Sequence, residues 1–239
     1  MFYKTKIKVL HQMLQQQQLL QVFFVGLTIG LQRTVIPAMA ETEFGVAQGS
    51  IVSLFAFVVS FGLVKGAMNF VSGRLSDSVG RRKVLIWGWL VALPIPFVIL
   101  LAPSWGWIVA ANVLLGVNQG FCWSMTVTAK FDIARPDQRG LATGVNEFAG
   151  YGGVAIAGLA TGYLASQFDP RTALFTFGLI VNLLALVAAI LAFAETRPQT
   201  SGTAKGPAVS AKSIFALVTW KSRDFQALSQ AGSVEKFVD

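Results

Sequence analysis

The chain has 239 residues, of which 54% are hydrophobic and 13% are charged, and its mean hydropathy is +0.61. A soluble domain usually carries about a quarter charged residues, whereas this chain contains apolar runs long enough to cross a hydrocarbon core of about 30 Å, so its composition excludes an ordinary soluble protein. The net charge of +8 does not indicate a nucleic-acid partner, because the basic residues lie between the apolar runs, where they set the membrane topology.

Six apolar runs predict an all-α, polytopic membrane protein with six transmembrane helices. In chain order, with boundaries good to about three residues, the runs are Leu19–Ala40, Ser50–Ser72, Val84–Ala102, Trp105–Ala129, Gly140–Ser166 and Thr172–Ala194. The polar gaps between them are as short as Pro103-Ser104, so neighbouring helices must run antiparallel.

The sequence divides into three regions. Residues 1–18 are predicted to form a cytoplasmic N-terminal segment, and residues 19–195 the transmembrane bundle. Residues 196–239 begin with a stretch rich in Ser, Thr, Gly, Pro and Ala, which is typical of a linker. The apolar stretch Ile214–Trp220 that follows is too short to span a membrane. We therefore expect the third region to be a cytoplasmic linker and the truncated start of a second bundle.

The distribution of basic residues predicts the orientation. With the N-terminus in the cytoplasm, sixteen lysines and arginines fall on the inside and one, Arg171, falls outside. This asymmetry predicts cytoplasmic N- and C-termini in a bacterial-type plasma (inner) membrane. An alternative treats the first run as a signal peptide cleaved after Ala38-Met39-Ala40. The run is longer than a signal core of about 7–15 residues, and Arg33 interrupts its end, so we favour an uncleaved span.

The loop between the second and third runs reads Gly-Arg-Leu-Ser-Asp-Ser-Val-Gly-Arg-Arg-Lys. Gly73 is expected to end a helix where two backbones approach closely, and Gly80 to adopt a positive φ in a tight reversal. Asp77 can accept hydrogen bonds from a helix N-terminus or from an arginine. Arg81, Arg82 and Lys83 are expected to anchor the loop at the anionic inner leaflet.

This loop resembles the signature loop of the major facilitator superfamily, Gly-x-Leu-(Ala/Ser)-Asp-(Arg/Lys)-x-Gly-(Arg/Lys)-(Arg/Lys), in both spacing and position. The matching residues are Gly73, Leu75, Ser76, Asp77, Gly80, Arg81 and Arg82. Ser78 departs, because the family usually has a basic residue there. The resemblance implies the N-terminal six-helix half of a secondary transporter, built as a 3+3 inverted repeat. It also implies that the loop is a conformational latch, which holds a helix of a second bundle. The latch residues would be Gly73, Asp77, Gly80, Arg81 and Arg82.

Three charged residues fall inside the apolar runs, where charge is costly and usually functional. Arg33 lies in the outer half of the first run, whereas Lys65 and Glu147 lie at similar depths from the cytoplasmic side. Their matched depth predicts an ion pair, and the alternative is that each side chain snorkels to an interface. Glu147 is the embedded carboxylate that could carry a co-transported proton.

Polar residues near the middle of the first and fourth spans complete the predicted pathway. Substrate sites of transporters lie at this depth, and the resemblance implies that these two spans line the central cavity. Gln32, Arg33, Asn118 and Gln119 are therefore predicted to face the solute, together with the embedded lysine and glutamate. The alternative is that the amides form hydrogen bonds that hold the helices together.

The sequence predicts transport rather than enzymatic catalysis. We find no phosphate-binding glycine loop, and one cysteine and one histidine do not provide a soft-metal site, so no cofactor or metal is expected. The expected function is secondary transport of a small solute by alternating access, by an incomplete half-length chain. A second six-helix half or a homodimer would then complete it in the bilayer. The alternative is a non-transporting truncated product or a membrane assembly subunit.

Overall fold

The computed structural model describes residues 2–47, 50–197, 210–227 and 230. Met1–Pro198 form one compact unit and Gln199–Asp239 form a second. The described part of the second unit contains α8 (Ala211–Ala216) and a π-helical segment, Leu217–Lys221. The predicted linker at 199–209 lies outside the described residues.

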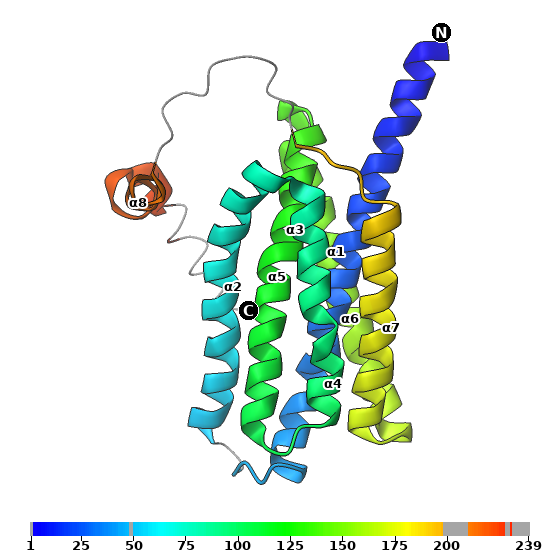
Figure 1. Ribbon diagram of the computed structural model, residues 1–239, viewed down its shortest axis with the longest axis vertical. Helices are drawn as coiled ribbons and strands as arrows, with labels where there is room; N and C mark the ends of the chain where they lie inside the picture. Colours follow the sequence, from blue (N-terminus) through cyan, green and yellow to red (C-terminus); the bar gives the residue numbers. More distant parts are fainter. Residues whose placement is uncertain (1, 48–49, 198–209, 228–229, 231–239) are drawn as a thin grey trace. The chain divides into compact units, whose positions relative to one another are not determined.

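The first unit is a bundle of helices that run side by side (Figure 1). Its helices are α1 (Phe2–Thr42), α2 (Ile51–Val79), α3 (Arg81–Ala92), α4 (Pro94–Leu100), α5 (Trp105–Ile133), α6 (Arg139–Gln167) and α7 (Pro170–Leu191). A 3-10 turn, Pro136–Gln138, precedes α6. Six helical stretches of the described chain are long and apolar enough to cross a membrane, and α3 and α4 together make the third of them. The prediction of an all-α, six-span protein is therefore confirmed.

The third span consists of two helical segments rather than the single helix expected, because prolines interrupt it. Pro96 has no N–H group, so the carbonyl oxygen of Ala92 lacks its usual donor within the helix. The buried side chain of Asn182, on α7, replaces that donor: its Nδ2 donates to Ala92 O at 2.8 Å. The Asn182 amide thus supplies the hydrogen bond that is missing at the break between α3 and α4, and it links this span to α7.

Replacing Asn182 with leucine should lower the free energy of unfolding by about 1–3 kcal/mol, because Ala92 O would stay buried without a donor. Thermal unfolding of the purified chain in detergent measures the loss. The double variant Asn182→Leu/Pro96→Ala should recover most of it, because alanine at 96 supplies an N–H group to the same carbonyl. An equal loss with and without Pro96→Ala would contradict this account.

The packing follows the 3+3 inverted repeat, in which α1 corresponds to α5 and α2 corresponds to α6. α1 packs most extensively against α6, and α5 packs most extensively against α2, so the two largest helix pairs are equivalent. α1 and α5 are also the most buried spans, and α2 and α6 are the most exposed. The central helices of the bundle are therefore the first and fourth spans.

Glycine pairs allow both central helices to approach their neighbours closely. Gly26 and Gly30 on α1 are four residues apart, as are Gly116 and Gly120 on α5. A Cβ at Gly26 would overlap the carbonyl oxygen of Gly150 on α6, and a Cβ at Gly116 would lie 3.0 Å from the carbonyl oxygen of Phe61 on α2. These are small-residue contacts of the kind that replaces hydrophobic driving force inside a membrane.

Candidate functional site

Gly80 forms the sharp junction between α2 and α3. Its φ of 100° lies in the region that L-residues with a side chain avoid, which confirms the predicted reversal. Its N–H group donates to Ser76 O at 3.0 Å, and a Cβ at this position would overlap the carboxylate of Glu195. Glycine is thus required here both by backbone conformation and by space.

Gly73 does not end a helix, contrary to the prediction. α2 continues to Val79, and no atom lies within 4 Å of a Cβ built at Gly73, so no backbone approaches it in the described part of the chain. The serines that follow are compatible with helix, because Ser76 and Ser78 donate their hydroxyls to Gly73 O and Leu75 O. The first seven residues of the motif therefore lie on the last two turns of α2.

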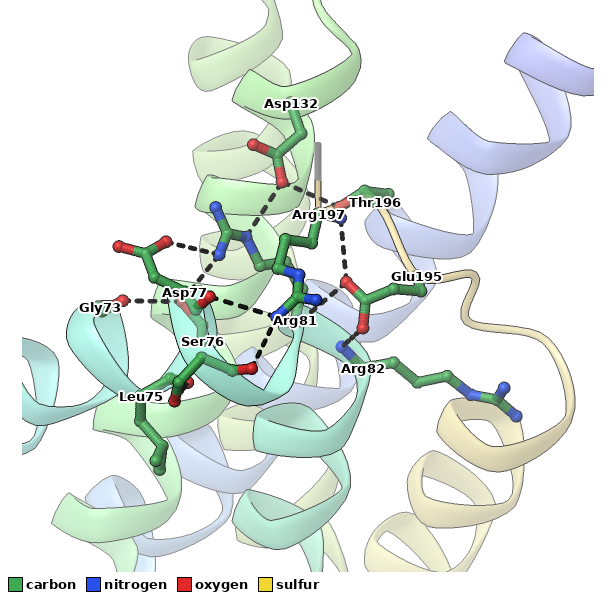
Figure 2. A network of polar contacts seen from close by, with 11 residues as sticks. Gly73, Leu75, Ser76, Asp77, Arg81, Arg82, Asp132, Glu195, Thr196 and Arg197 are labelled. Carbon is green, nitrogen blue, oxygen red and sulfur yellow. Dashed lines mark hydrogen bonds and ion pairs between the residues drawn. The ribbon is translucent and has the colours of Figure 1, made fainter. Parts of the chain in front are cut away.

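The guanidinium of Arg81, the first residue of α3, is held by two carboxylates (Figure 2). Nη1 lies 2.7 Å from Asp77 Oδ1, and Nε lies 3.1 Å from Asp132 Oδ2 on α5. The side chains of Arg81 and Asp132 are 8% and 11% exposed, whereas that of Asp77 is 73% exposed. Arg81 therefore joins α2, α3 and α5 at one end of the bundle, and Asp77 presents the accessible side of this contact.

Glu195, four residues beyond the end of α7, binds the N-terminus of α3. Its carboxylate accepts the backbone N–H groups of Arg81 at 2.9 Å, of Arg82 at 3.2 Å and of Arg197 at 2.9 Å. Burial raises the pKa of Glu195, but these three hydrogen bonds and the charge of Arg197 outweigh burial, so the pKa lies below its ordinary value. The carboxylate is thereby held ionised at the positive end of the α3 dipole.

The residues after Glu195 add further contacts to the same end of the bundle (Figure 2). Thr196 Oγ1 donates to Asp132 Oδ2 at 3.1 Å, and Arg197 Nη1 donates to Ser78 O at 2.6 Å. Arg82 Nη2 donates to Ile190 O in the last turn of α7. The chain that leaves α7 is therefore fastened to the α2–α3 junction, so the predicted latch loop belongs to a network that also includes α5 and the end of α7.

A second group of interacting side chains lies in the middle of the helices. Lys65 Nζ on α2 lies 4.9 Å from the ring centroid of Trp123 on α5. The indole Nε1 of Trp123 donates to Glu147 Oε1 on α6 at 3.1 Å, and the ring of Tyr151 meets the indole edge-on at 5.8 Å between centroids. Both members of the predicted ion pair thus contact Trp123.

Asn118 and Gln119 are fully buried inside the bundle, where they form hydrogen bonds between helices. Asn118 Nδ2 donates to Gly88 O on α3 at 3.0 Å. Gln119 Nε2 donates to Val25 O at 3.1 Å and to Thr28 Oγ1 at 2.9 Å, both on α1. These contacts match the alternative interpretation, in which the amides hold α5 against its neighbours.

Gln32 and Arg33 are adjacent in sequence but differ in exposure. Gln32 is 5% exposed and lines a cavity of about 20 Å³ between α1, α4, α5 and α7. Arg33 is exposed on the C-terminal half of α1. Of the six predicted pathway residues, Arg33, Lys65 and Glu147 have accessible side chains, whereas Gln32, Asn118 and Gln119 are buried within the bundle.

The comparison with protein families decides the identity of this fold. The family model of the Major Facilitator Superfamily matches residues 19–231, which is most of the chain. The chain belongs to the major facilitator superfamily. The family membership that the loop pattern indicated explains why Asp77, Gly80 and Arg81 occur together at the α2–α3 junction. No curated protein matches the chain.

Solved structures of superfamily transporters share the fold. The human organic anion transporter MFSD10 (TETRAN) superposes with a TM-score of 0.62 at 18% identity, covering 79% of this chain and 49% of that one. A peptide transporter, POT in complex with sulfate, gives a TM-score of 0.62 at 15% identity, covering 94% of this chain and 44% of that one. This chain therefore spans about half the length of the superfamily structures that it matches.

Sequence reasoning missed four residues of this superfamily protein that the structure brings into the two groups. Asp132, Glu195 and Thr196 join the network around Arg81. Trp123 contacts both Lys65 and Glu147. A signal existed for the first three, because polar residues just after the fourth and sixth runs must lie at the same membrane surface as the loop. Trp123 gave no such signal, since an aromatic residue in an apolar span is ordinary.

Proposed function

We propose that this chain forms one six-helix half of a secondary transporter, which moves a small solute across the membrane by alternating access. The observation that carries the proposal is the side chain of Asp77. It is 73% exposed although it contacts the buried Arg81. A carboxylate can accept several hydrogen bonds, so Asp77 is able to bind a helix beyond the described bundle. Gly80 shapes the junction that follows Asp77, and Arg82 anchors this junction to the end of α7. Together with Gly73, Asp77 and Arg81, these residues form the proposed latch.

The exposed faces of α2 and α6 support the presence of a partner. Six glycines on these helices have no atom within 4 Å of a Cβ position, whereas Gly26, Gly30, Gly116 and Gly120 on the central helices are closely packed. The open glycines are Gly62, Gly66 and Gly73 on α2 and Gly140, Gly144 and Gly152 on α6. Such positions allow another helix to approach closely. A second six-helix half or a second copy of this chain would cover them.

We place the solute pathway along the accessible charged residues Arg33, Lys65 and Glu147, since charge at mid-membrane depth must face water or protein. Behind this pathway, Asn118 holds α5 against α3 and Gln119 holds α5 against α1, while Gln32 lines the small cavity beside them. Glu147 is the proposed site of a co-transported proton. Cytoplasmic termini in a plasma (inner) membrane complete the proposal.

A cysteine introduced at Ser78 should react with an impermeant maleimide only from the cytoplasmic side, and reaction from outside would reverse this orientation.

Solute uptake into proteoliposomes tests the transport proposal. The purified chain should catalyse flux driven by an ion or solute gradient, as a monomer or as a homodimer, and Asp77→Asn should reduce the flux without unfolding the protein. Because the side chain of Asp77 is exposed, the substitution should leave the stability of the bundle unchanged, so a loss of flux would report on the latch alone. Absence of flux for every solute offered would overturn autonomous transport. The chain would then be a non-transporting truncated product or an assembly subunit.

A further inference from the structure

The small cavity between α1, α4, α5 and α7 brings two amide side chains together. It has a volume of about 20 Å³, and Gln32 on α1 and Asn182 on α7 both line it. These two residues are only 5% and 3% exposed, so bulk solvent does not solvate them. Their oxygens, Gln32 Oε1 and Asn182 Oδ1, accept no hydrogen bond from any residue in the described part of the chain. Two buried acceptors therefore lie at one cavity without a donor.

The polar groups beside the cavity are already engaged. Asn182 Nδ2 donates to Ala92 O at 2.8 Å, which directs the amide nitrogen toward the break between α3 and α4. Thr28 also lines the cavity, but its hydroxyl donates to Val25 O at 2.8 Å and accepts from Gln119 Nε2 at 2.9 Å. The other lining residues are aliphatic, proline or glycine. The side chains around the cavity thus offer acceptors and apolar surface, but no free donor.

The size of the cavity and its two acceptors fit one water molecule. A buried water needs a cavity of about 10–15 Å³ and several polar partners, and this cavity has about 20 Å³. A water carries two O–H groups, which is the number of donors that Gln32 Oε1 and Asn182 Oδ1 lack. An acceptor that is buried without a donor loses its hydration and gains nothing in return. A water that donates to both oxygens removes this loss.

A small cation such as sodium would also suit two oxygens, but charge argues against it. None of the described residues that line the cavity carries a charge. A cation would therefore be buried among apolar side chains without a counter-charge, which is far more costly than burying a neutral molecule that is hydrogen-bonded. The lining favours water over an ion.

We infer that this cavity binds one water molecule, which donates one hydrogen bond to Gln32 Oε1 and one to Asn182 Oδ1. The water joins α1 to α7 beside the break between α3 and α4, where α4 runs next to α7 (Figure 1). Asn182 then binds in two directions, to Ala92 O through its nitrogen and to α1 through its oxygen and the water. The water site is independent of the proposed transport function, and it makes Gln32 a ligand of this water rather than of a solute.

A high-resolution structure of the chain in nanodiscs, bound to an antibody fragment, tests the site directly. It should show one density peak within about 2.7–3.2 Å of both oxygens. A cavity closed by its apolar lining, or a direct hydrogen bond between the two amides, would overturn the inference.

Thermal unfolding in detergent tests the same site in solution. Gln32→Met keeps the length of the side chain and removes the acceptor, so the midpoint of unfolding should fall by about 2–4 °C. Gln16→Met, at an exposed glutamine of the same helix, is the matched control and should cause no shift. In the Asn182→Leu/Pro96→Ala background the water has already lost its second acceptor, so Gln32→Met should then cause a smaller fall. An equal fall in both backgrounds would contradict a bridge between Gln32 and Asn182.

Replacing sodium chloride by choline chloride distinguishes water from a cation. The unfolding midpoint of the unaltered chain should be the same in both salts, because a bound water needs no sodium. A midpoint that rises with sodium in the unaltered chain but not in Gln32→Met would show that the cavity is a cation site and would overturn the inference.

Discussion

Gly26→Leu is expected to prevent the bundle from folding. A side chain at this position would overlap the carbonyl oxygen of Gly150, which is backbone on α6 and cannot rotate away. The two helices would have to separate along the largest interface of the bundle. Overpacking of a well-packed core costs about 1–3 kcal/mol when side chains can adjust, and we expect at least about 3 kcal/mol here because they cannot. Size-exclusion chromatography of the detergent extract should show little monodisperse protein.

Gly62→Leu is the matched control. It makes the same substitution in a transmembrane glycine, but no atom lies within 4 Å of the Cβ position on α2. The variant should elute and unfold like the unaltered chain. Its effect should appear only where α2 meets a partner, as reduced flux or reduced dimerisation. Equal expression and thermal stability of Gly26→Leu and Gly62→Leu would show that the close α1–α6 contact does not limit folding.

The number of spans and the family could be predicted from the sequence because both depend on local patterns. Run length alone predicts six membrane helices, and a loop pattern with fixed spacing places Gly80 at the α2–α3 junction, where φ is 100°. The helix end predicted at Gly73 was wrong because a glycine inside a helix is tolerated when its neighbours favour the helix. Only the tertiary arrangement shows that α2 continues for two further turns.

The side-chain partners could not be predicted, because hydrophobic patterns in a membrane helix do not report which face is buried against protein. Asn118 and Gln119 are at the right depth for a solute, yet both point into the bundle and form hydrogen bonds with α3 and α1. Asp132 and Glu195 are far from Arg81 in sequence, and only the return of α5 and α7 to the same end brings them together. Depth could be estimated from the sequence, but helix rotation could not.

Arg81→Met should lower the free energy of unfolding by about 3–5 kcal/mol, since it leaves the carboxylate of Asp132 buried without its cation. Denaturant titration in mixed micelles measures the change. The chain contains a control pair with the same nitrogen–oxygen distance. Arg135 and Asp137 are also 3.1 Å apart, but their side chains are 70% and 60% exposed. Arg135→Met should therefore cost no more than about 0.5 kcal/mol.

The double variant Arg81→Met/Asp132→Leu tests whether Arg81 stabilises the bundle through its ion pair with Asp132 or through its other contacts. Replacing both charges by apolar groups removes the unpaired buried carboxylate, so most of the lost stability should return. Asp77 is exposed and remains solvated in this background. Stability would then be restored while the contact between Asp77 and Arg81 is lost, and any transport defect that persists would be due to the latch rather than to unfolding. A double variant as unstable as Arg81→Met would instead mean that the guanidinium stabilises the α2–α3 junction through Asp77 and Ser76.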